Sequence, residues 1–276
     1  MRTAFPLMTL LLTLAPGLQA QLMTAAGPPP SNNLRVLGDF PVLEFRRYAI
    51  KPGEREHFAA YFESYFPEAF QQLGSVAAGT FFDRGNPTGF TWIRGYHTIE
   101  ARAVINAAFY YGPVWREHRT TLNDLMDDSD DVLLLQAVSA DRAVTILPAV
   151  DPVREAGARG VAVALICQLN PGTAAAFARA AEPVFAKYRA AGAREMGLFV
   201  TLDVPNNFPQ LPVRSDGPYV VWLGLLPDEA ALGRFREVAD PAMATLTGTG
   251  MVRGTPELVV LDPTPRSRMR WLPQPK

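Results

Sequence analysis

The side chains with the clearest chemical potential lie on a predicted strand, residues 90–96. Because side chains alternate between the two faces of a strand, one face gathers aromatic groups around a fixed cation: Phe90, Trp92, Arg94 and Tyr96. Such a row can hold an aromatic molecule that bears an acidic group, or stabilise an anion that forms on it. The guanidinium otherwise needs a carboxylate within the protein, for which there are two candidates, Glu44 and Glu100.

A helix predicted over residues 113–126 can complete the site. Several of its side chains recur at spacings of three and four residues and share one stripe: Trp115, His118, Arg119, Leu122 and Met126. If this stripe packs on the strand row, the two enclose a pocket lined by Trp92, Arg94, Tyr96, Tyr110, Tyr111, Trp115, His118 and Asn123. An aromatic cleft with a few polar groups is the usual form of a small-molecule site. The alternative is ordinary packing of these aromatic residues in a core.

Three residues of this pocket are candidates for catalysis. His118 would be a general base, Arg94 would stabilise an anion, and Asn123 would orient a substrate. His118 could also serve as the axial ligand of a haem, although a histidine on such a stripe is more often a hydrogen-bonded packing residue. Apart from that haem, no cofactor is expected.

Other common chemistries lack their motifs. The chain has 3 histidines and neither a His-Glu-x-x-His nor a Cys-x-x-Cys spacing, which argues against a metal site. The acidic run 127–131 lacks the glycine and the terminal glutamate of a calcium loop and is interpreted as a solvated turn. No nucleophile elbow, phosphate loop or dinucleotide fingerprint is present. The single cysteine, Cys167, follows an apolar run and is expected to be a buried, unreactive thiol.

The composition is that of a globular protein with a small or apolar partner. Of 276 residues, 48% are hydrophobic and 19% are charged, and the formal net charge is -1. A chain so weakly charged has no long-range field to hold nucleic acid or an anionic membrane, so neither is expected as a partner.

The two ends of the chain are interpreted as accessory segments. Residues 1–20 combine a positive start, a short apolar stretch and a small residue at Ala20, which predicts a cleaved signal peptide and a periplasmic or secreted protein that leaves the membrane after cleavage. Residues 21–40 are rich in Pro, Gly and Ala and are predicted to be a flexible linker. Residues 263–276 are interpreted as a tail, with Trp271 available to pin it to the body.

Between these ends, the order strand, helix, strand, strand, helix, strand occurs twice. In the first half, strands are expected at 42–48, 79–82, 90–96 and 132–135, with helices from about Gly53 to 73, 99–110 and 113–126. In the second half, strands are expected at 161–169, 198–204, 219–225 and 258–261, with helices at 173–191 and 227–238. This pattern predicts two domains, 41–140 and 160–262, joined by a linker at 141–159.

The spacing of phenylalanines supports a duplication. Phe58 and Phe66 follow Gly53 at the same distances at which Phe177 and Phe185 follow Gly172, an offset of 119 residues. In the second hairpin Trp222 corresponds to Trp92, but Gly224 stands where the first half has Arg94. Nothing there resembles Tyr110, Tyr111, Trp115 or His118. Any pocket is therefore expected in the first half, with the second half as its structural partner.

The first half also resembles a known family. The segments Phe45-Arg46-Arg47-Tyr48, Phe90–Tyr96, Ala108–Trp115 and Asp128–Leu135 are similar to those of bacterial members of the NIPSNAP family, over about residues 42–137. The second half is linked to the family only through the internal repeat. The resemblance implies an α+β fold of the dimeric α/β-barrel superfamily, in which two ferredoxin-like domains pair. Here the two tandem domains would form an intrachain pseudo-dimer. The chain would then be a monomer, or it would form a homodimer.

Three functions remain open at this point. The first is a binding module that holds a small aromatic or apolar molecule, with Arg94 pairing with its acidic group. The second is an enzyme of the kind the superfamily includes, a cofactor-independent monooxygenase acting on a phenolic substrate. The third is an assembly scaffold without a pocket.

Overall fold

The first half of the chain forms a four-stranded antiparallel sheet with helices on one face. The computed structural model describes residues 40–144, 146–147 and 160–271. The strands are β1 (Val42–Ile50), β2 (Val76–Asp83), β3 (Gly89–Tyr96) and β4 (Met126–Ala137). The helices are α2 (Arg55–Tyr65), α3 (Pro67–Gln72), α4 (Ile99–Tyr110) and α5 (Pro113–Asp124), and the 3-10 turn η1 (Ala140–Arg142) follows β4.

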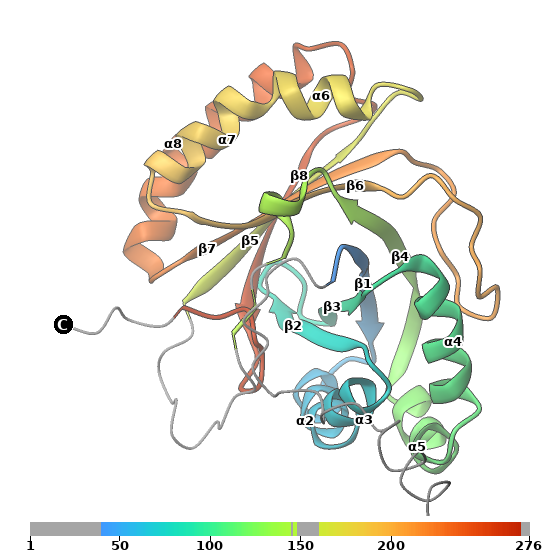
Figure 1. The fold of residues 1–276 in the computed structure, drawn as a ribbon. Coiled ribbons are helices and arrows are strands. Elements are labelled where there is room, and N and C mark those ends of the chain that lie inside the picture. Colours follow the sequence, from blue (N-terminus) through green and yellow to red (C-terminus); the bar gives the residue numbers. More distant parts are fainter. Residues whose placement is uncertain (1–39, 145, 148–159, 272–276) are drawn as a thin grey trace, which may run out of the picture. The chain divides into compact units, whose positions relative to one another are not determined.

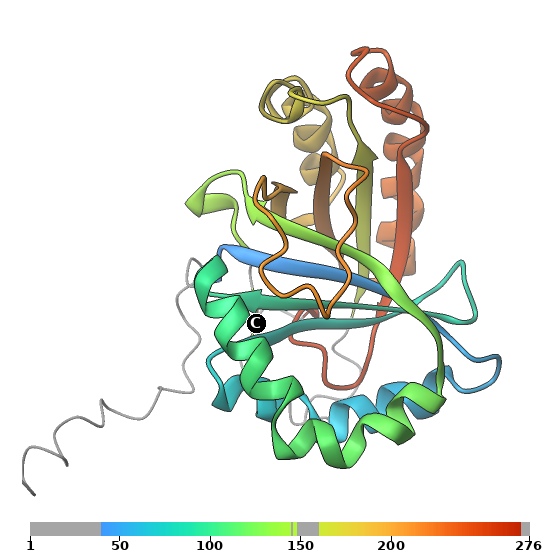
Figure 2. The same ribbon diagram turned by 90° about the vertical axis from the view of Figure 1, so that its right-hand side faces the viewer.

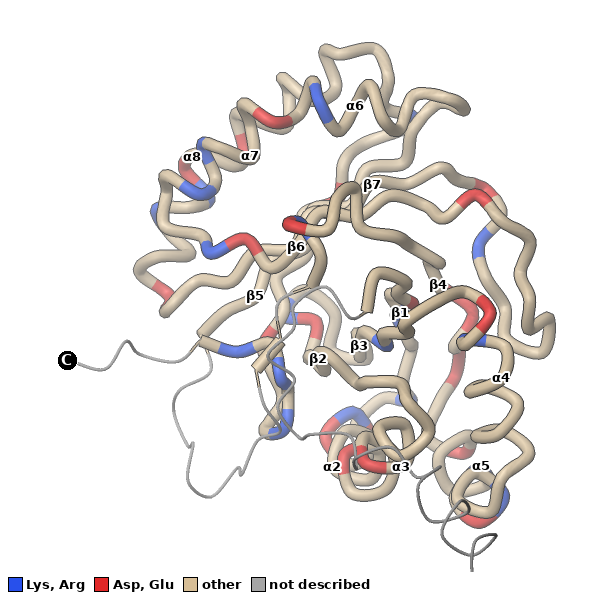
Figure 3. The backbone as a smooth tube through the Cα atoms, in the orientation of Figure 1, with Lys and Arg blue, Asp and Glu red and all other residues tan. Residues whose placement is uncertain are grey.

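The second half builds a similar sheet. Its strands are β5 (Val161–Gln168), β6 (Arg194–Thr201), β7 (Tyr219–Leu226) and β8 (Glu257–Pro263). Its helices are α6 (Ala174–Ala180), α7 (Glu182–Ala190) and α8 (Glu229–Thr247). They lie against the outer face of this sheet (Figure 1) and carry charges of both signs on α7 and α8 (Figure 3).

The two sheets join into one closed eight-stranded barrel. The order around the barrel is β1-β3-β2-β8-β5-β7-β6-β4, so that the four strands of each half follow the same order. Short pairings of β2 with β8 and of β4 with β6 close it. Closure gives each of these eight strands a partner strand on both sides, and Figure 2 shows the barrel from the side of β4.

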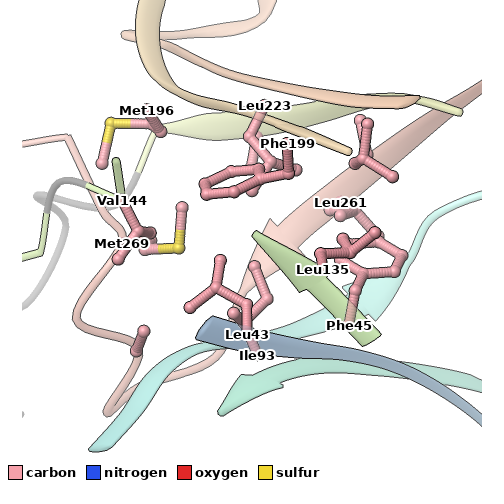
Figure 4. Packing of buried hydrophobic residues seen from close by; sticks show 14 of the residues in the cluster. Leu43, Phe45, Ile93, Leu135, Val144, Met196, Phe199, Leu223, Leu261 and Met269 are labelled. Carbon is pink, nitrogen blue, oxygen red and sulfur yellow. The ribbon is translucent and has the colours of Figure 1, made fainter. Parts of the chain in front are cut away.

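Apolar side chains from both halves fill the barrel interior. They include Leu43 and Phe45 from β1, Phe199 from β6 and Leu223 from β7, which point toward one another in Figure 4. An eight-stranded barrel is just wide enough for side chains to fill. The remaining space for chemistry is therefore on the outer faces, where the sheets meet their helices.

A bulge recurs at the same place in each half. The register of β2 shifts at Gly79, and the register of β6 shifts at Gly197. Two residues later, the rings of Phe81 and Phe199 lie over these glycines, where a Cβ would approach the ring to 2.6 and 2.3 Å. Only glycine leaves room for the phenylalanine to turn into the barrel.

Several predicted boundaries differ from the observed ones. The acidic run 127–131 is not a turn but the exposed start of β4, because β1 continues to pair with it as far as Met126 and Arg47 forms an ion pair with Asp131. Helix α8 runs to Thr247, well beyond the predicted end at 238. It passes through Pro241 because Ala242 and Leu246 bury their side chains in the second-half core. The first predicted helix is divided at Phe66, where Pro67 begins α3.

The predicted signal peptide lies outside the described residues, as does the predicted linker up to residue 39 and most of the linker 141–159. The segment interpreted as a tail packs on the barrel at least as far as Trp271, which contacts the interior cluster. Thr264 and Ser267 are buried, and Thr264 donates a hydrogen bond to the buried carboxylate of Glu63. In the part of the chain that the structure describes, no helix has the length and apolar character that crossing a bilayer requires.

Candidate functional site

The outer face of the first sheet carries a buried cluster of charged side chains. Alternation along β1 places Glu44 and Arg46 on this face, and the register pairs Glu44 with Arg94 and Arg46 with Trp92 on β3. Arg102 joins them from α4. The four charged side chains are at most 1% exposed, which is rare for these residue types.

Glu44 is the centre of this cluster. Its Oε2 accepts hydrogen bonds from Nη1 of Arg46 at 3.0 Å and from Nε and Nη2 of Arg94 at 3.0 and 2.6 Å. Its Oε1 accepts from Nε of Arg102 at 2.7 Å. Burial alone would raise the pKa of Glu44, but the three guanidiniums together lower it well below its usual value. The carboxylate is therefore ionised at any physiological pH.

The cluster has more positive than negative charge. It sets three guanidiniums against one carboxylate. Despite burial, the pKa of Arg94 is raised well above its usual value by the charge of Glu44, so that this guanidinium stays charged. Among the described residues, four buried nitrogen atoms around the cluster have no hydrogen-bond acceptor: Trp92 Nε1, Arg94 Nη1, Arg102 Nη2 and Asn106 Nδ2. Buried polar groups are normally paired, so this group of donors calls for an explanation.

A cavity of about 250 Å³ lies between this face and the helices. Its floor is formed by Arg46, Tyr48 and Trp92 from the sheet. Aromatic side chains of the helices form its walls, namely Phe62, Phe66, Phe70, Phe109, Tyr110 and Trp115. Toward solvent it is bordered by Asn123, Met126, Ser129 and Asp130, and the buried Leu122 also lines it. The cavity combines an apolar aromatic interior with one charged group in its floor, the form expected of a small-molecule site.

A loop from the second half closes one side of the cavity. Gln210, Leu211 and Pro212, in the long connection between β6 and β7, line it. The connection is held on α4, since Asn207 donates to the carbonyl of Ile99 at 2.5 Å and accepts from Nη1 of Arg102 at 2.8 Å. Figures 1 and 2 show this orange loop beside α4. The second half thus contributes to the cavity, whereas the sequence predicted a pocket of the first half alone.

The structure brings only part of the predicted pocket together. Trp92, Tyr110, Trp115 and Asn123 line the cavity. Arg94 and Tyr96 are on the same face but lie outside the lining: Arg94 is bonded to Glu44, and the hydroxyl of Tyr96 donates to Asn106 at 2.8 Å. Of the two carboxylates considered for Arg94, Glu44 is the partner.

Tyr111 and His118 lie away from the cavity. Tyr111 is 56% exposed, is not part of the cavity lining, and accepts a hydrogen bond from Gln210. Nδ1 of His118 is 2.8 Å from the hydroxyl of Tyr61, and its ring stacks on Tyr65 with centroids 3.8 Å apart. Three residues turn a helix by about 300°, so His118 faces α2 when Trp115 faces the cavity. This position does not suit a haem ligand in the cavity.

In the charged cluster and the cavity floor, the residues not predicted from the sequence are Arg46, Tyr48 and Arg102. Nε of Arg46 donates to the hydroxyl of Tyr48 at 2.8 Å, and the guanidinium carbon lies 5.6 Å from the centroid of Trp92. Arg46 and Tyr48 could have been found from the alternation of side chains along residues 42–48, which puts positions 44, 46 and 48 on one face of the sheet. The contribution of Gln210–Pro212 had no comparable signal, because it depends on how the two halves meet.

The second half provides an internal comparison, position by position. The register that pairs Glu44 with Arg94 and Arg46 with Trp92 pairs Val163 with Gly224 and Leu165 with Trp222. Cys167 stands where the first half has Tyr48, and burial raises the pKa of its thiol to about 12, as the prediction of an unreactive cysteine requires. At these β5 and β7 positions the sheet face is thus apolar in the second half and charged in the first, although Glu195 on β6 places a carboxylate beside Trp222.

The two tryptophans differ accordingly. Nε1 of Trp222 donates to Glu195 at 2.9 Å, and the indole lies so close over Gly224 that a Cβ there would be 2.3 Å from it. Trp92 is equally buried, but its Nε1 has no acceptor and its indole borders the cavity. The fold alone therefore requires neither the charges nor the unpaired indole.

Three hollows among the described residues are larger. One of about 590 Å³ is lined by Leu134, Pro171 and residues of the connection between β6 and β7, and the other two differ in character from the cavity. One of about 710 Å³ runs along α6 beside β6 and is lined by alanines, Ser139 and the surface ion pair of Arg142 with Glu182. Another of about 430 Å³, near Arg47 and Glu257, is lined by exposed ion pairs. The hollow beside α6 is the larger of these two, but neither contains a buried hydrogen-bond donor without an acceptor.

Across residues 40–144, 146–147 and 160–271, no three His, Cys, Asp or Glu side chains lie close enough together to bind a metal ion.

Comparison with known proteins finds a family match in the first half of the chain. Residues 43–140 match the NIPSNAP family model. These residues include the charged face of β1 and β3 together with α4, α5 and most of the cavity wall. No curated protein matches the chain.

Solved structures with low sequence identity share the fold. A candidate monooxygenase from Lactobacillus acidophilus is 14% identical, with a TM-score of 0.54, over 84% of this chain and 98% of its own. A second candidate monooxygenase, from Fusobacterium nucleatum, is 10% identical with a TM-score of 0.56, over 86% and 98%. A NIPSNAP family protein of unknown function from Agrobacterium tumefaciens is 19% identical with a TM-score of 0.33, over 37% and 93%. The first two likenesses establish the mixed α/β fold and carry no activity over to this chain.

Proposed function

We propose that this protein is an exported, NIPSNAP-like binding protein that holds a small aromatic or apolar molecule in the cavity between β1, β3 and α5. The observation that carries this proposal is the difference between the halves. At matching positions of the register, the second half has Val163, Leu165 and Gly224, and its indole is paired. The first half has a buried ion cluster, an unpaired indole nitrogen and a cavity.

The two halves are further proposed to be a duplicated domain that pairs within one chain. Three features support this: the identical strand order, the matching bulges at Gly79 and Gly197, and the constant offset of 119 residues between buried phenylalanines. Duplication leaves one copy free to keep an apolar face while the other gains a site. The export proposal rests on residues 1–20 and is tested separately, by the N-terminal residue of the protein recovered outside the cytoplasm.

The experiment is a calorimetric titration with 2-naphthamide, a neutral probe with two fused rings. Ser129→Trp places an indole at the border of the cavity and should abolish binding. The matched control, Ser139→Trp, places the same group in the larger hollow beside α6 and should leave binding unchanged. If Ser139→Trp loses binding and Ser129→Trp keeps it, the probe binds in the hollow beside α6 and not in the cavity. If the unchanged protein does not bind the probe, the proposal is wrong.

A monooxygenase-type reaction is the second candidate. Arg46 in the floor could stabilise a phenolate, and Asn123 at the border could orient it. The proposed base, His118, is bonded to Tyr61 outside the cavity, and the only carboxylate of the lining is the exposed Asp130. Binding is therefore the function that the geometry supports better.

A further inference from the structure

The buried cluster contains more cationic charge than its own carboxylate balances. Arg46, Arg94 and Arg102 all direct donors to Glu44, and two positive charges remain in excess. Taking a charge out of water is costly unless it is paired, so further negative charge near the excess would stabilise the cluster. Of the four unpaired donors around the cluster, the Trp92 N–H belongs to a residue that lines the cavity, and an anion there would accept from it.

We propose that the ligand of the cavity is an aromatic monoanion whose ionised oxygen, a carboxylate or a phenolate, lies against Arg46 and Trp92. This inference rests on the proposed binding function and adds the class of ligand. Arg46 is the charged residue of the cluster that lines the cavity, and Glu44 and Tyr48 hold its Nη1 and Nε in place. Trp92 adds a buried N–H without an acceptor on the same floor.

The distribution of charge around the cavity sets the orientation of such a ligand. Asp130 is exposed at the border, where its carboxylate disfavours an anionic group. The walls between border and floor are the rings of Phe62, Phe66 and Trp115. An acidic group is therefore drawn inward to Arg46 and the ring system remains between the aromatic walls, where its apolar surface is buried.

The size of the cavity limits the ring system. About 250 Å³ lies just below the range of roughly 300–1,000 Å³ found for drug-sized ligands. One ring or two fused rings with a single acidic substituent fit this volume.

Two probes of matched shape test the inference. At pH 7, 2-naphthoate is ionised, and 2-naphthamide is its neutral counterpart. We expect 2-naphthoate to bind about tenfold more tightly, the difference that a charge-assisted hydrogen bond supplies. Arg46→Leu introduces the residue that the second half has at this position, and it should remove the preference while 2-naphthamide still binds.

The control is Arg47→Leu, which removes a guanidinium from the next position of β1, where it is bonded to Glu257 outside the cavity. This variant should keep the full preference. If the unchanged protein binds both probes with equal affinity, the ligand is not an anion, although the proposed binding function still holds. This comparison uses only the unchanged protein, so it does not depend on whether a variant folds. A preference that survives in Arg46→Leu would overturn the role of Arg46, and failure of both probes to bind would overturn the binding function and the inference together.

Discussion

Replacing Glu44 with glutamine keeps the shape of the side chain and removes the negative charge at the centre of the cluster. In the native protein this fully buried carboxylate accepts four hydrogen bonds from three guanidiniums, at 2.6 to 3.0 Å. Removing one partner of a buried ion pair costs about 3–5 kcal/mol, because the other charge is left uncompensated. Three cations lose their partner here, so we expect Glu44→Gln to lower the free energy of unfolding by at least the upper part of that range.

Urea unfolding at pH 7 measures this loss, and its pH dependence identifies the cause. The pKa of Glu44 is lowered below its unfolded-state value of about 4.3, so the stabilisation is fully present above that pH and is lost as pH falls toward the folded-state pKa. The difference between the native protein and Glu44→Gln should therefore be constant from pH 8 to pH 5 and shrink below about pH 4. A loss under about 1 kcal/mol at pH 7, the size of an exposed ion pair, would show that Glu44 does not balance the buried guanidiniums.

Three further predictions concern residues around the site. Trp222→Phe should destabilise the protein by about 1.5–3 kcal/mol more than Trp92→Phe, because only the indole of Trp222 donates to a carboxylate, and equal losses would contradict this. Asn207→Ala removes the bonds of the loop to Arg102 and Ile99, and it should speed amide hydrogen exchange of residues 203–213 about tenfold, whereas Asn170→Ala, at a different loop, should not. Cys167 should resist a thiol reagent at pH 8 in the native protein and react in urea, since burial raises its pKa to about 12; rapid labelling of the native protein would place it at the surface.

The sequence predicted the elements of this fold well, because alternation and helical spacing are local signals. Trp92 and Arg94 were placed on the correct face, and Trp222 was matched to Trp92 from spacing alone, as the register confirms. The acidic run 127–131 was misassigned because its composition is typical of a turn. The pairing that makes it a strand comes from β1, about 80 residues earlier in the chain.

The site itself was only partly predictable. A stripe of side chains three or four residues apart spans a wide angle, so the sequence could not say that Trp115 would face the sheet and His118 would face Tyr61. Arg46 could have been found by extending the alternation argument from β3 to β1. The sequence could not predict that the loop residues Gln210, Leu211 and Pro212 line the cavity. Their position depends on the closure of the barrel and on the hydrogen bond from Asn207 to α4.

The most direct test of a ligand site in the first half is a crystal structure of the protein grown with 2-naphthoate. We predict electron density for the naphthalene between Trp92 and Trp115, with the carboxylate within hydrogen-bond distance of Arg46. Density for the probe in the hollow beside α6, or side chains of the loop filling the space above Trp92, would contradict it.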